Sequence, residues 1–496
     1  MTPGEGPGRP GDGATLGTGP ALIRVLARAL VRLFYHRVEV VGVERVPRSG
    51  PLVIVANHQN ALVDPLLLIA TLPRALRPVA KAPLFRHPLV APFLHLAGAL
   101  PIHRRRDPGS DPAQNAATFQ AVAAALRRGG AILIFPEGVS QPEPVLMPLR
   151  TGVARMVLGT ESTAGVPATT LLPVGLTFHE PGTFRSGWAL VLVGAPVPVD
   201  DCRALAAREP EGAVRELTSR VAEALRALIV EVEDRETLRL ALGLEAIRRA
   251  EAEDGPAPTD AVDAADAPDA TGGGTPRAER VAWVQVATRA YRWLAPRAPA
   301  RVARLRAEVE RYLADLERLG LSPHVVGRAY PPGVARRYAV REGLALLGGL
   351  PLAAWGVASH ALPYWLTALA ARCLATSPDV TATVKLVAGA VLYPACWALE
   401  AWVAWRWVGG WGLTAFVVGL IPTGLFALSW QTRLARVRRD AWAFVRFLWD
   451  RDLLARLAAR RRALVVETET LARLLPAEVL AGGAGSDDTG RRDGRQ

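Results

Sequence analysis

A histidine and an aspartate follow an apolar run closely enough to act together. His58 and Asp64 lie just beyond PLVIVA (51–56), and five residues separate them. A neutral imidazole held by a carboxylate can take a proton from a hydroxyl group, and the carboxylate then stabilises the imidazolium. His58 and Asp64 are therefore the candidate general base and its orienting partner.

The residues around Asp64 predict the structure of this segment. The Asp64-Pro65 pair is typical of a helix start, with the aspartate at the N-cap and the proline at the first helical position. His58 then lies in the turn between a strand and a helix, and a turn can bring the two side chains together. The alternative is that Asp64 only caps its helix and His58 only hydrogen-bonds within a turn.

Three further stretches strengthen the functional interpretation of His58 and Asp64. They are GALPIHRRRD (98–107), IFPEGVSQPEPVLMPLRTGVARM (134–156) and LLPVGLTF (171–178). The first contains Arg104, and a guanidinium group matches the geometry of phosphate. The second places Glu137 and Gly138 after a strand, where glycine lets the backbone approach a ligand closely. The alternative for the arginine cluster is a solvated surface run.

Together with GVERVPRSGPLVIVANH (42–58), and in this order, these blocks resemble the glycerolipid acyltransferase family, which contains the glycerol-3-phosphate and lysophosphatidic acid acyltransferases. The resemblance covers roughly residues 38–200. It implies that His58 deprotonates the acceptor hydroxyl, which attacks an acyl thioester directly, while Asp64 orients the histidine. It also implies a site for the substrate phosphate at Arg104, Glu137, Gly138 and Lys81, where Glu137 orients arginines or accepts from the glycerol hydroxyl.

The spacing departs from the usual pattern of that family, which has four residues between the histidine and the aspartate. The five-residue version resembles the fungal-type dual glycerol-3-phosphate/dihydroxyacetone-phosphate acyltransferases, as do FPEGVS (135–140) and LMPLRTGVARM (146–156). Those enzymes also carry a long membrane-bound C-terminal part. The acceptor therefore stays open among glycerol-3-phosphate, dihydroxyacetone phosphate and lysophosphatidate.

The order of apolar runs predicts an α/β domain with a mixed sheet flanked by helices. The expected strands are 51–56, 75–80, 131–135, 169–178 and 188–194. A helical stretch over 211–250 closes the domain. At its start, ALIRVLARALVRLFYHR (21–37) predicts an amphipathic helix with arginines four residues apart. That helix either lies on a membrane or packs on the domain.

The C-terminal part predicts an all-α transmembrane region. The stretches 343–365, 386–405 and 411–430 are apolar and about as long as a bilayer core requires. Arginines follow Trp430, which places that end in the cytoplasm. Three crossings would separate it from the catalytic part, so we favour an even number, with 361–374 as an extra short segment. The expectation is a multi-pass membrane protein whose catalytic domain faces the cytoplasm.

These predictions divide the 496-residue chain into seven parts. They are a disordered N-terminus (1–20), the acyltransferase domain (21–250), a disordered acidic linker (251–279), a helical segment (280–340), transmembrane helices (341–432), basic amphipathic helices (433–480) and a disordered tail (481–496). The formal net charge of +13 suits anionic lipids and phosphate-bearing substrates rather than indicating a nucleic-acid partner. Three scattered cysteines predict neither a disulfide framework nor a zinc site.

Three functions fit these residues. The first is a membrane-bound O-acyltransferase that needs no metal or cofactor and takes its acyl group from acyl-CoA or acyl carrier protein. The second is a hydrolase in which Ser140 pairs with His58, although Ser140 does not stand in a G-x-S-x-G turn. The third is a membrane-anchored lipid-binding or scaffold protein with a non-catalytic acyltransferase-like domain.

Overall fold

The computed structural model describes residues 18–35, 37–88, 90–104, 115–141, 143–164, 168–178, 188–232, 235–252, 276–321, 323, 326, 332–375, 377–449 and 451–481. The predicted disordered segments 1–20, 251–279 and 481–496 lie almost wholly outside these residues. The chain divides into two compact units. Unit 1 holds residues 1–229 and 375–387, and unit 2 holds 230–374 and 388–496. The acyltransferase domain expected from the sequence ended at residue 250, whereas the first stretch of unit 1 ends at residue 229.

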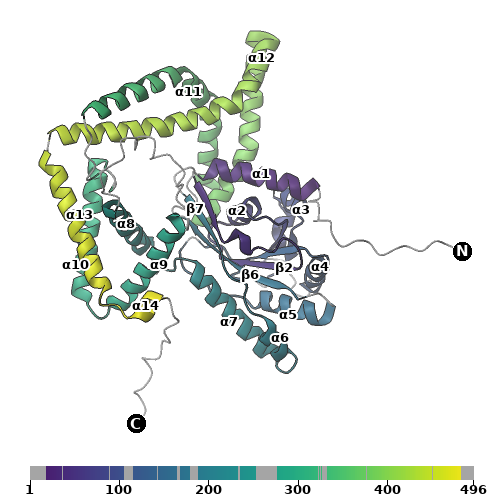
Figure 1. Cartoon of the computed structure of the whole chain (residues 1–496). Coiled ribbons are helices and arrows are strands. Elements are labelled where there is room, and N and C mark those ends of the chain that lie inside the picture. The colour runs from purple at the N-terminus through teal and green to yellow at the C-terminus, as the bar shows by residue number, and fades with distance from the viewer. Residues whose placement is uncertain are drawn as a thin grey trace. The chain divides into compact units, whose positions relative to one another are not determined.

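Unit 1 is built on a seven-stranded sheet with the order β1-β7-β6-β2-β5-β3-β4 (Figure 1). The strands are β1 (Arg37–Val41), β2 (Leu52–Ala56), β3 (Leu76–Lys81), β4 (Leu100–Ile102), β5 (Ala131–Ile134), β6 (Thr170–Phe178) and β7 (Trp188–Val193). Only β6 and β7 pair antiparallel among these strands, and the other neighbours are parallel. The predicted mixed sheet is therefore confirmed.

Helices cover both faces of this sheet (Figure 1). They are α1 (Thr18–Phe34), α2 (Val63–Thr71), α3 (Ala91–Leu96), α4 (Asn115–Arg127), α5 (Gly152–Ala164), α6 (Asp200–Ala206) and α7 (Pro210–Leu228), with short 3-10 helices η1 (Val43–Arg45) and η2 (Ala82–Arg86). Ile54 faces the core formed with α1 and α2, whereas Val53 and Val55 face the core formed with α4, α5 and α7. Burial on both faces explains why β2 is an uninterrupted apolar run.

Helix α1 packs on the domain, which was one of the two alternatives for this segment. Its buried side chains are Ile23, Ala27, Val31 and Phe34. Arg24 donates a hydrogen bond of 2.9 Å to the Leu72 carbonyl, and Arg28 donates one of 3.1 Å to the Ala70 carbonyl. The last carbonyls of a helix have no partner within the helix, so these two arginines supply the hydrogen bonds that the C-terminal end of α2 lacks.

Unit 2 is helical. Its elements are α8 (Arg235–Ala252), α9 (Pro276–Leu294), α10 (Pro299–Leu319), α11 (Pro332–Leu374), α13 (Arg451–Ala472), α14 (Ala477–Ala481) and most of α12 (Pro378–Trp449). The charged helix α10 is not solvated all round, because Val309, Tyr312 and Leu316 are buried in a core shared with α13. The salt bridge between Arg301 and Glu467 also joins these two helices.

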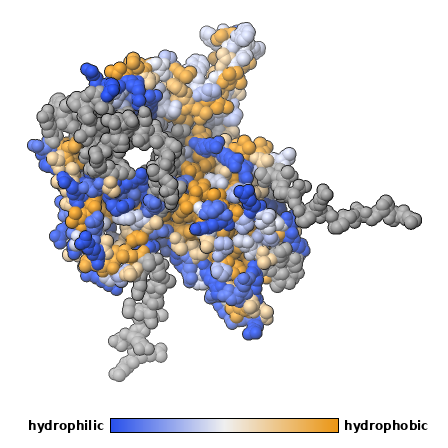
Figure 2. Space-filling model, in the orientation of Figure 1, coloured by the Kyte–Doolittle hydropathy of each residue, from blue (hydrophilic) through white to orange (hydrophobic). Residues whose placement is uncertain are grey.

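Among the residues that the structure describes, two helices are long and apolar enough to cross a membrane, over Arg336–Leu374 and Val380–Arg438. The expected extra segment 361–374 is not separate, since it continues α11. Helix α12 leaves helical geometry at Gly409, so the predicted segments 386–405 and 411–430 lie on either side of a kink. Trp407 and Trp411 are 84% and 88% exposed, and Figure 2 shows hydrophobic residues on the surface of α12. Exposed apolar helices of this length are suited to a lipid environment.

Candidate active site

The predicted site residues follow strands that end at one edge of the sheet. Strands β2, β5, β3 and β4 are consecutive and mutually parallel, so their carboxyl ends lie on the same side. His58 follows β2, and Glu137 and Gly138 follow β5. Lys81 ends β3 in register with Ile102 of β4, two residues before Arg104. This carboxyl edge is where open α/β sheets place their ligands.

His58 and Asp64 form a hydrogen-bonded pair, as the sequence predicted. The imidazole Nδ1 lies 2.8 Å from Asp64 Oδ2, and Asp64 is fully buried while the His58 side chain is 17% exposed. An ionised carboxylate only accepts hydrogen bonds, so in the neutral tautomer that fits this contact Nδ1 carries the proton and Nε2 has a free lone pair. The ring stacks on Phe135 with centroids 4.1 Å apart, which fixes its plane. The pair is thus arranged to accept a proton at Nε2.

Asp64 does not cap its helix in the predicted way. Helix α2 begins at Val63, because the Val63 amide already donates to the Asn60 carbonyl at 2.7 Å, and Asp64 is its second residue. The carboxylate instead turns back toward residues 59–63, which we call the bend. There Oδ2 also accepts the amides of Gln59 at 2.7 Å and Asn60 at 2.8 Å. Asp64 therefore organises the five-residue bend and the imidazole with one oxygen.

The bend contains a strained residue. Ala61 has a φ of +34°, and no other non-glycine residue in the described part of the chain has a positive φ. L-residues with a side chain avoid this region because Cβ crowds the following carbonyl. The bend with five intervening residues thus closes onto His58 through an unfavourable backbone conformation at Ala61.

Glu137 is a buried support for the histidine. It is 3% exposed, its Oε1 accepts the His58 amide at 2.8 Å, and its Oε2 accepts the Met147 amide at 3.0 Å. The Gln141 amide donates to the His58 carbonyl at 3.0 Å, so both backbone groups of His58 are held by the segment after β5. In the described part of the chain, the hydrogen bonds identified for Glu137 are to these backbone amides and not to an arginine.

Burial of the Glu137 carboxyl changes the pH dependence of stability. Burial raises the pKa of Glu137 from 4.5 to about 7, against the opposing effect of the hydrogen bonds from Met147 and His58. The folded state therefore binds this proton more tightly than the unfolded state. The resulting stabilisation is complete below pH 4.5 and is lost as the pH rises through about 7. Because one pKa unit corresponds to about 1.4 kcal/mol, the rise from 4.5 to about 7 stabilises the folded state by at most about 3.5 kcal/mol.

We expect the thermal unfolding midpoint of the wild type to fall more between pH 5 and pH 8 than that of Glu137→Gln, which cannot ionise. The measurement is a melting curve of the full-length protein in detergent at each pH. Identical pH dependence in the two proteins would show that Glu137 does not titrate in this range.

A hydrogen bond brings Arg104 and Gly138 together, and Lys81 ends the strand next to β4. The Arg104 guanidinium donates to the Gly138 carbonyl, and Gly138 adopts a φ of +69° that favours glycine. Lys81 is exposed at the end of β3, and among the described residues it forms no hydrogen bond or ion pair with either. Arg105 and Arg106 lie outside the described residues.

Asn57 is a site residue that the sequence analysis missed. Its side-chain amide donates to the Leu176 carbonyl at 2.9 Å and accepts the Leu176 amide at 2.7 Å. This pair of bonds joins the end of β2 to β6 immediately before His58. The signal in the sequence was a polar residue directly after an apolar strand; in the structure Asn57 is 2% exposed, and buried polar groups are usually hydrogen-bonded.

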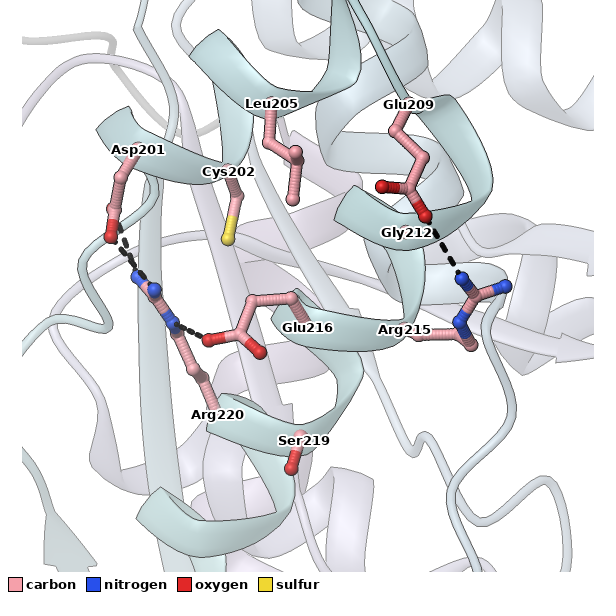
Figure 3. Close-up of a pocket in the computed structure, with 9 residues that line it drawn as sticks. All are labelled: Asp201, Cys202, Leu205, Glu209, Gly212, Arg215, Glu216, Ser219 and Arg220. Carbon is pink, nitrogen blue, oxygen red and sulfur yellow. Dashed lines mark hydrogen bonds and ion pairs between the residues drawn. The ribbon is translucent and has the colours of Figure 1, made fainter.

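A surface hollow between α6 and α7 does not contribute to this chemistry. Figure 3 shows Arg220 paired with Asp201 and Glu216, and Arg215 paired with Glu209. Both arginines of the hollow are thus paired with its carboxylates, and its lining contains none of the predicted site residues. We assign the hollow no role in the reaction.

One segment of the chain matches a known protein family. Residues 37–177 match the protein family described as Acyltransferase. This segment contains β1 to β5 and most of β6, together with His58, Asp64 and the other predicted site residues. The resemblance to acyltransferases drawn from the sequence blocks is therefore confirmed for this segment.

Curated relatives of the chain are also named as acyltransferases. Glycerol-3-phosphate O-acyltransferase 2 of Saccharomyces cerevisiae is 32% identical over 27% of this chain and 18% of its own length. The human 1-acyl-sn-glycerol-3-phosphate acyltransferase alpha is 29% identical over 38% of this chain and 66% of its own length. The chain thus spans less than two thirds of the length of each of these relatives. The crystal structure of a 1-acyl-sn-glycerophosphate acyltransferase from Thermotoga maritima is 22% identical over 40% of this chain and 80% of its own, with a TM-score of 0.29.

Proposed function

We propose that the protein is a membrane-bound O-acyltransferase of glycerolipid synthesis. It transfers a fatty acyl group from an acyl thioester to the hydroxyl of glycerol-3-phosphate or 1-acyl-glycerol-3-phosphate. The observation that carries this proposal is the 2.8 Å contact between His58 Nδ1 and Asp64 Oδ2 inside an acyltransferase domain. The names of the yeast and human relatives support the acceptor class.

In the proposed reaction, His58 Nε2 takes the proton of the acceptor hydroxyl while Asp64 stabilises the imidazolium. The hydroxyl oxygen attacks the thioester carbonyl, so a C–O bond forms as the C–S bond breaks. The thiolate leaves and receives the proton from the imidazolium, which restores neutral His58. No acyl-enzyme forms, and the chain needs no metal or cofactor beyond its donor, acyl-CoA or acyl carrier protein.

Arg104 and Lys81 supply the positive charge for the acceptor phosphate. Both belong to the carboxyl edge, and the Arg104 contact with Gly138 fixes the guanidinium close to the segment after β5. Glu137 acts indirectly here, because its two oxygens hold the backbone of His58 and Met147. The phosphate therefore lies between the basic side chains and the imidazole in this proposal.

We expect Arg104→Ala to raise KM for a phosphate-bearing acceptor roughly ten- to hundredfold, because a hydrogen bond to a charged group is lost. Membranes containing the full-length protein are given a labelled acyl thioester with glycerol-3-phosphate, dihydroxyacetone phosphate, lysophosphatidate or uncharged monoacylglycerol. Arg155→Ala serves as the control, since Arg155 is exposed and pairs with Glu211. If Arg104→Ala raised KM for monoacylglycerol by the same factor, phosphate binding by Arg104 would be contradicted.

The same assay separates the alternative functions. Free fatty acid released without any acceptor indicates the hydrolase. A phosphate-bearing lipid that binds without turnover indicates a non-catalytic lipid-binding protein. Either result would overturn the proposed acyl transfer.

The proposal also includes several membrane crossings with the acyltransferase domain in the cytoplasm. Two helices of sufficient length and hydropathy, and the arginines after Trp430, support it. Protease treatment of sealed vesicles of known orientation tests the arrangement. Protection of the domain in vesicles that expose the cytoplasmic face would contradict it.

A further inference from the structure

A distant segment of the chain contacts the bend that carries the His58–Asp64 pair. Residues 375–387 belong to unit 1, although 145 residues (230–374) separate them from its first part. This segment, which we call the strap, includes the start of α12. Within it, Ala382 is fully buried in the core beside α1 and α2, and Leu386 packs against the same core. The strap is therefore an integral part of the acyltransferase unit.

A hydrogen bond joins the strap to the bend. The Leu62 amide donates to the Thr383 hydroxyl oxygen at 3.2 Å. The amides of Gln59 and Asn60 are satisfied by Asp64, and that of Val63 by the Asn60 carbonyl. Leu62 is thus the bend residue whose amide, among the described residues, reaches a segment far away in the sequence.

This contact lies next to the strained position. Leu62 immediately follows Ala61, whose φ of +34° requires support from its surroundings. Asp64 lies two residues further on, and it can reach the imidazole only while the bend keeps this shape. A bond that fixes Leu62 therefore acts on the direction of the Asp64 carboxylate.

We propose that Thr383 is a positioning residue for His58. By accepting the Leu62 amide, Thr383 keeps the Ala61 bend closed and so keeps Asp64 bonded to the imidazole. This inference rests on the proposed function of His58 as the general base. It also links the beginning of α12, a helix with the composition of a membrane span, to the geometry of the catalytic pair.

The first test compares three variants of the full-length protein in membranes. Thr383→Val removes the acceptor but keeps the shape, and we expect kcat to fall roughly three- to tenfold with KM for the acyl donor unchanged. Thr383→Ser keeps the hydroxyl and should restore most of kcat. The matched control is Thr381→Val, because the Thr381 hydroxyl bonds only the Ser377 carbonyl of its own segment among the contacts identified here. Equal kcat in Thr383→Val and Thr381→Val would overturn the proposal.

A second test separates positioning through Ala61 from a general loss of packing. Glycine adopts positive φ without strain, so in an Ala61→Gly background the bend depends less on Thr383. We expect Thr383→Val to lower kcat by a smaller factor in that background than in the wild type. If Thr383→Val lowered kcat by the same factor in both backgrounds, Thr383 would not act through the bend.

A third measurement does not depend on turnover. Diethyl pyrocarbonate modifies accessible imidazole nitrogens, and mass spectrometry of the peptide containing His58 gives the rate of modification. We expect His58 to be modified faster in Thr383→Val than in Thr381→Val, because a loosened bend exposes Nδ1. Equal rates would reject positioning by Thr383 even if the protein transfers no acyl group, whereas faster modification without turnover would reject only the proposed function.

Discussion

Replacing His58 with alanine is expected to lower acyl transfer by about 10³-fold or more, since a positioned general base contributes 10²- to 10⁴-fold. The variant loses the only nitrogen that the proposed reaction uses to take up the hydroxyl proton. Its backbone hydrogen bonds to Glu137 and Gln141 do not involve the imidazole, so the fold should persist. The measurement is the initial rate of labelled acyl transfer in membranes that contain equal amounts of each protein.

His95→Ala provides the matched control for this result. His95 is exposed on α3, where it contacts Phe85 edge to face. We expect the control to keep the wild-type rate. Full turnover by His58→Ala, or an equal loss in both variants, would reject His58 as the base.

Asp64→Asn is expected to reduce kcat by about 10²- to 10⁴-fold, in line with the loss seen when the carboxylate of a hydrogen-bonded histidine pair is neutralised. The amide oxygen can replace Oδ2 and still accept from Gln59 and Asn60. The negative charge that stabilises the imidazolium is absent, however. A large fall in kcat with a nearly unchanged unfolding midpoint would therefore identify the charge of Asp64, rather than its hydrogen bonds, as the catalytic contribution.

Asp200→Asn is the control for this substitution, because the Asp200 side chain is 95% exposed and pairs only with Arg203 among the contacts identified here. It should retain wild-type kcat. If Asp64→Asn lowered stability and kcat in proportion, the carboxylate would be a structural centre of the bend and not a partner in proton transfer.

The sequence analysis located the sheet where its strands are long and apolar. The expected strand 169–178 corresponds to β6, and 51–56 corresponds to β2. Strand β1 was missed because Arg37 and Glu39 interrupt its apolar residues, and β4 was missed because it has three residues, one of them Pro101. Short or polar strands depend on their neighbours for hydrogen bonds, and a single sequence does not contain that information.

The site could be predicted only as far as local spacing reaches. The contact between His58 and Asp64 follows from a turn of a few residues, so it was predicted, although the N-cap role of Asp64 was wrong. The backbone bonds of Glu137 depend on how the segment after β5 folds against the segment after β2. The Thr383 contact joins positions 321 residues apart, and no local pattern predicts such a pairing.

The division of unit 1 into two stretches of sequence has a consequence for biosynthesis. The ribosome must translate residues 230–374 before it adds the strap. During that interval the nascent chain lacks Ala382 and Thr383, which complete the core and the bend. A newly made domain therefore matures only once translation has passed α11 and started α12.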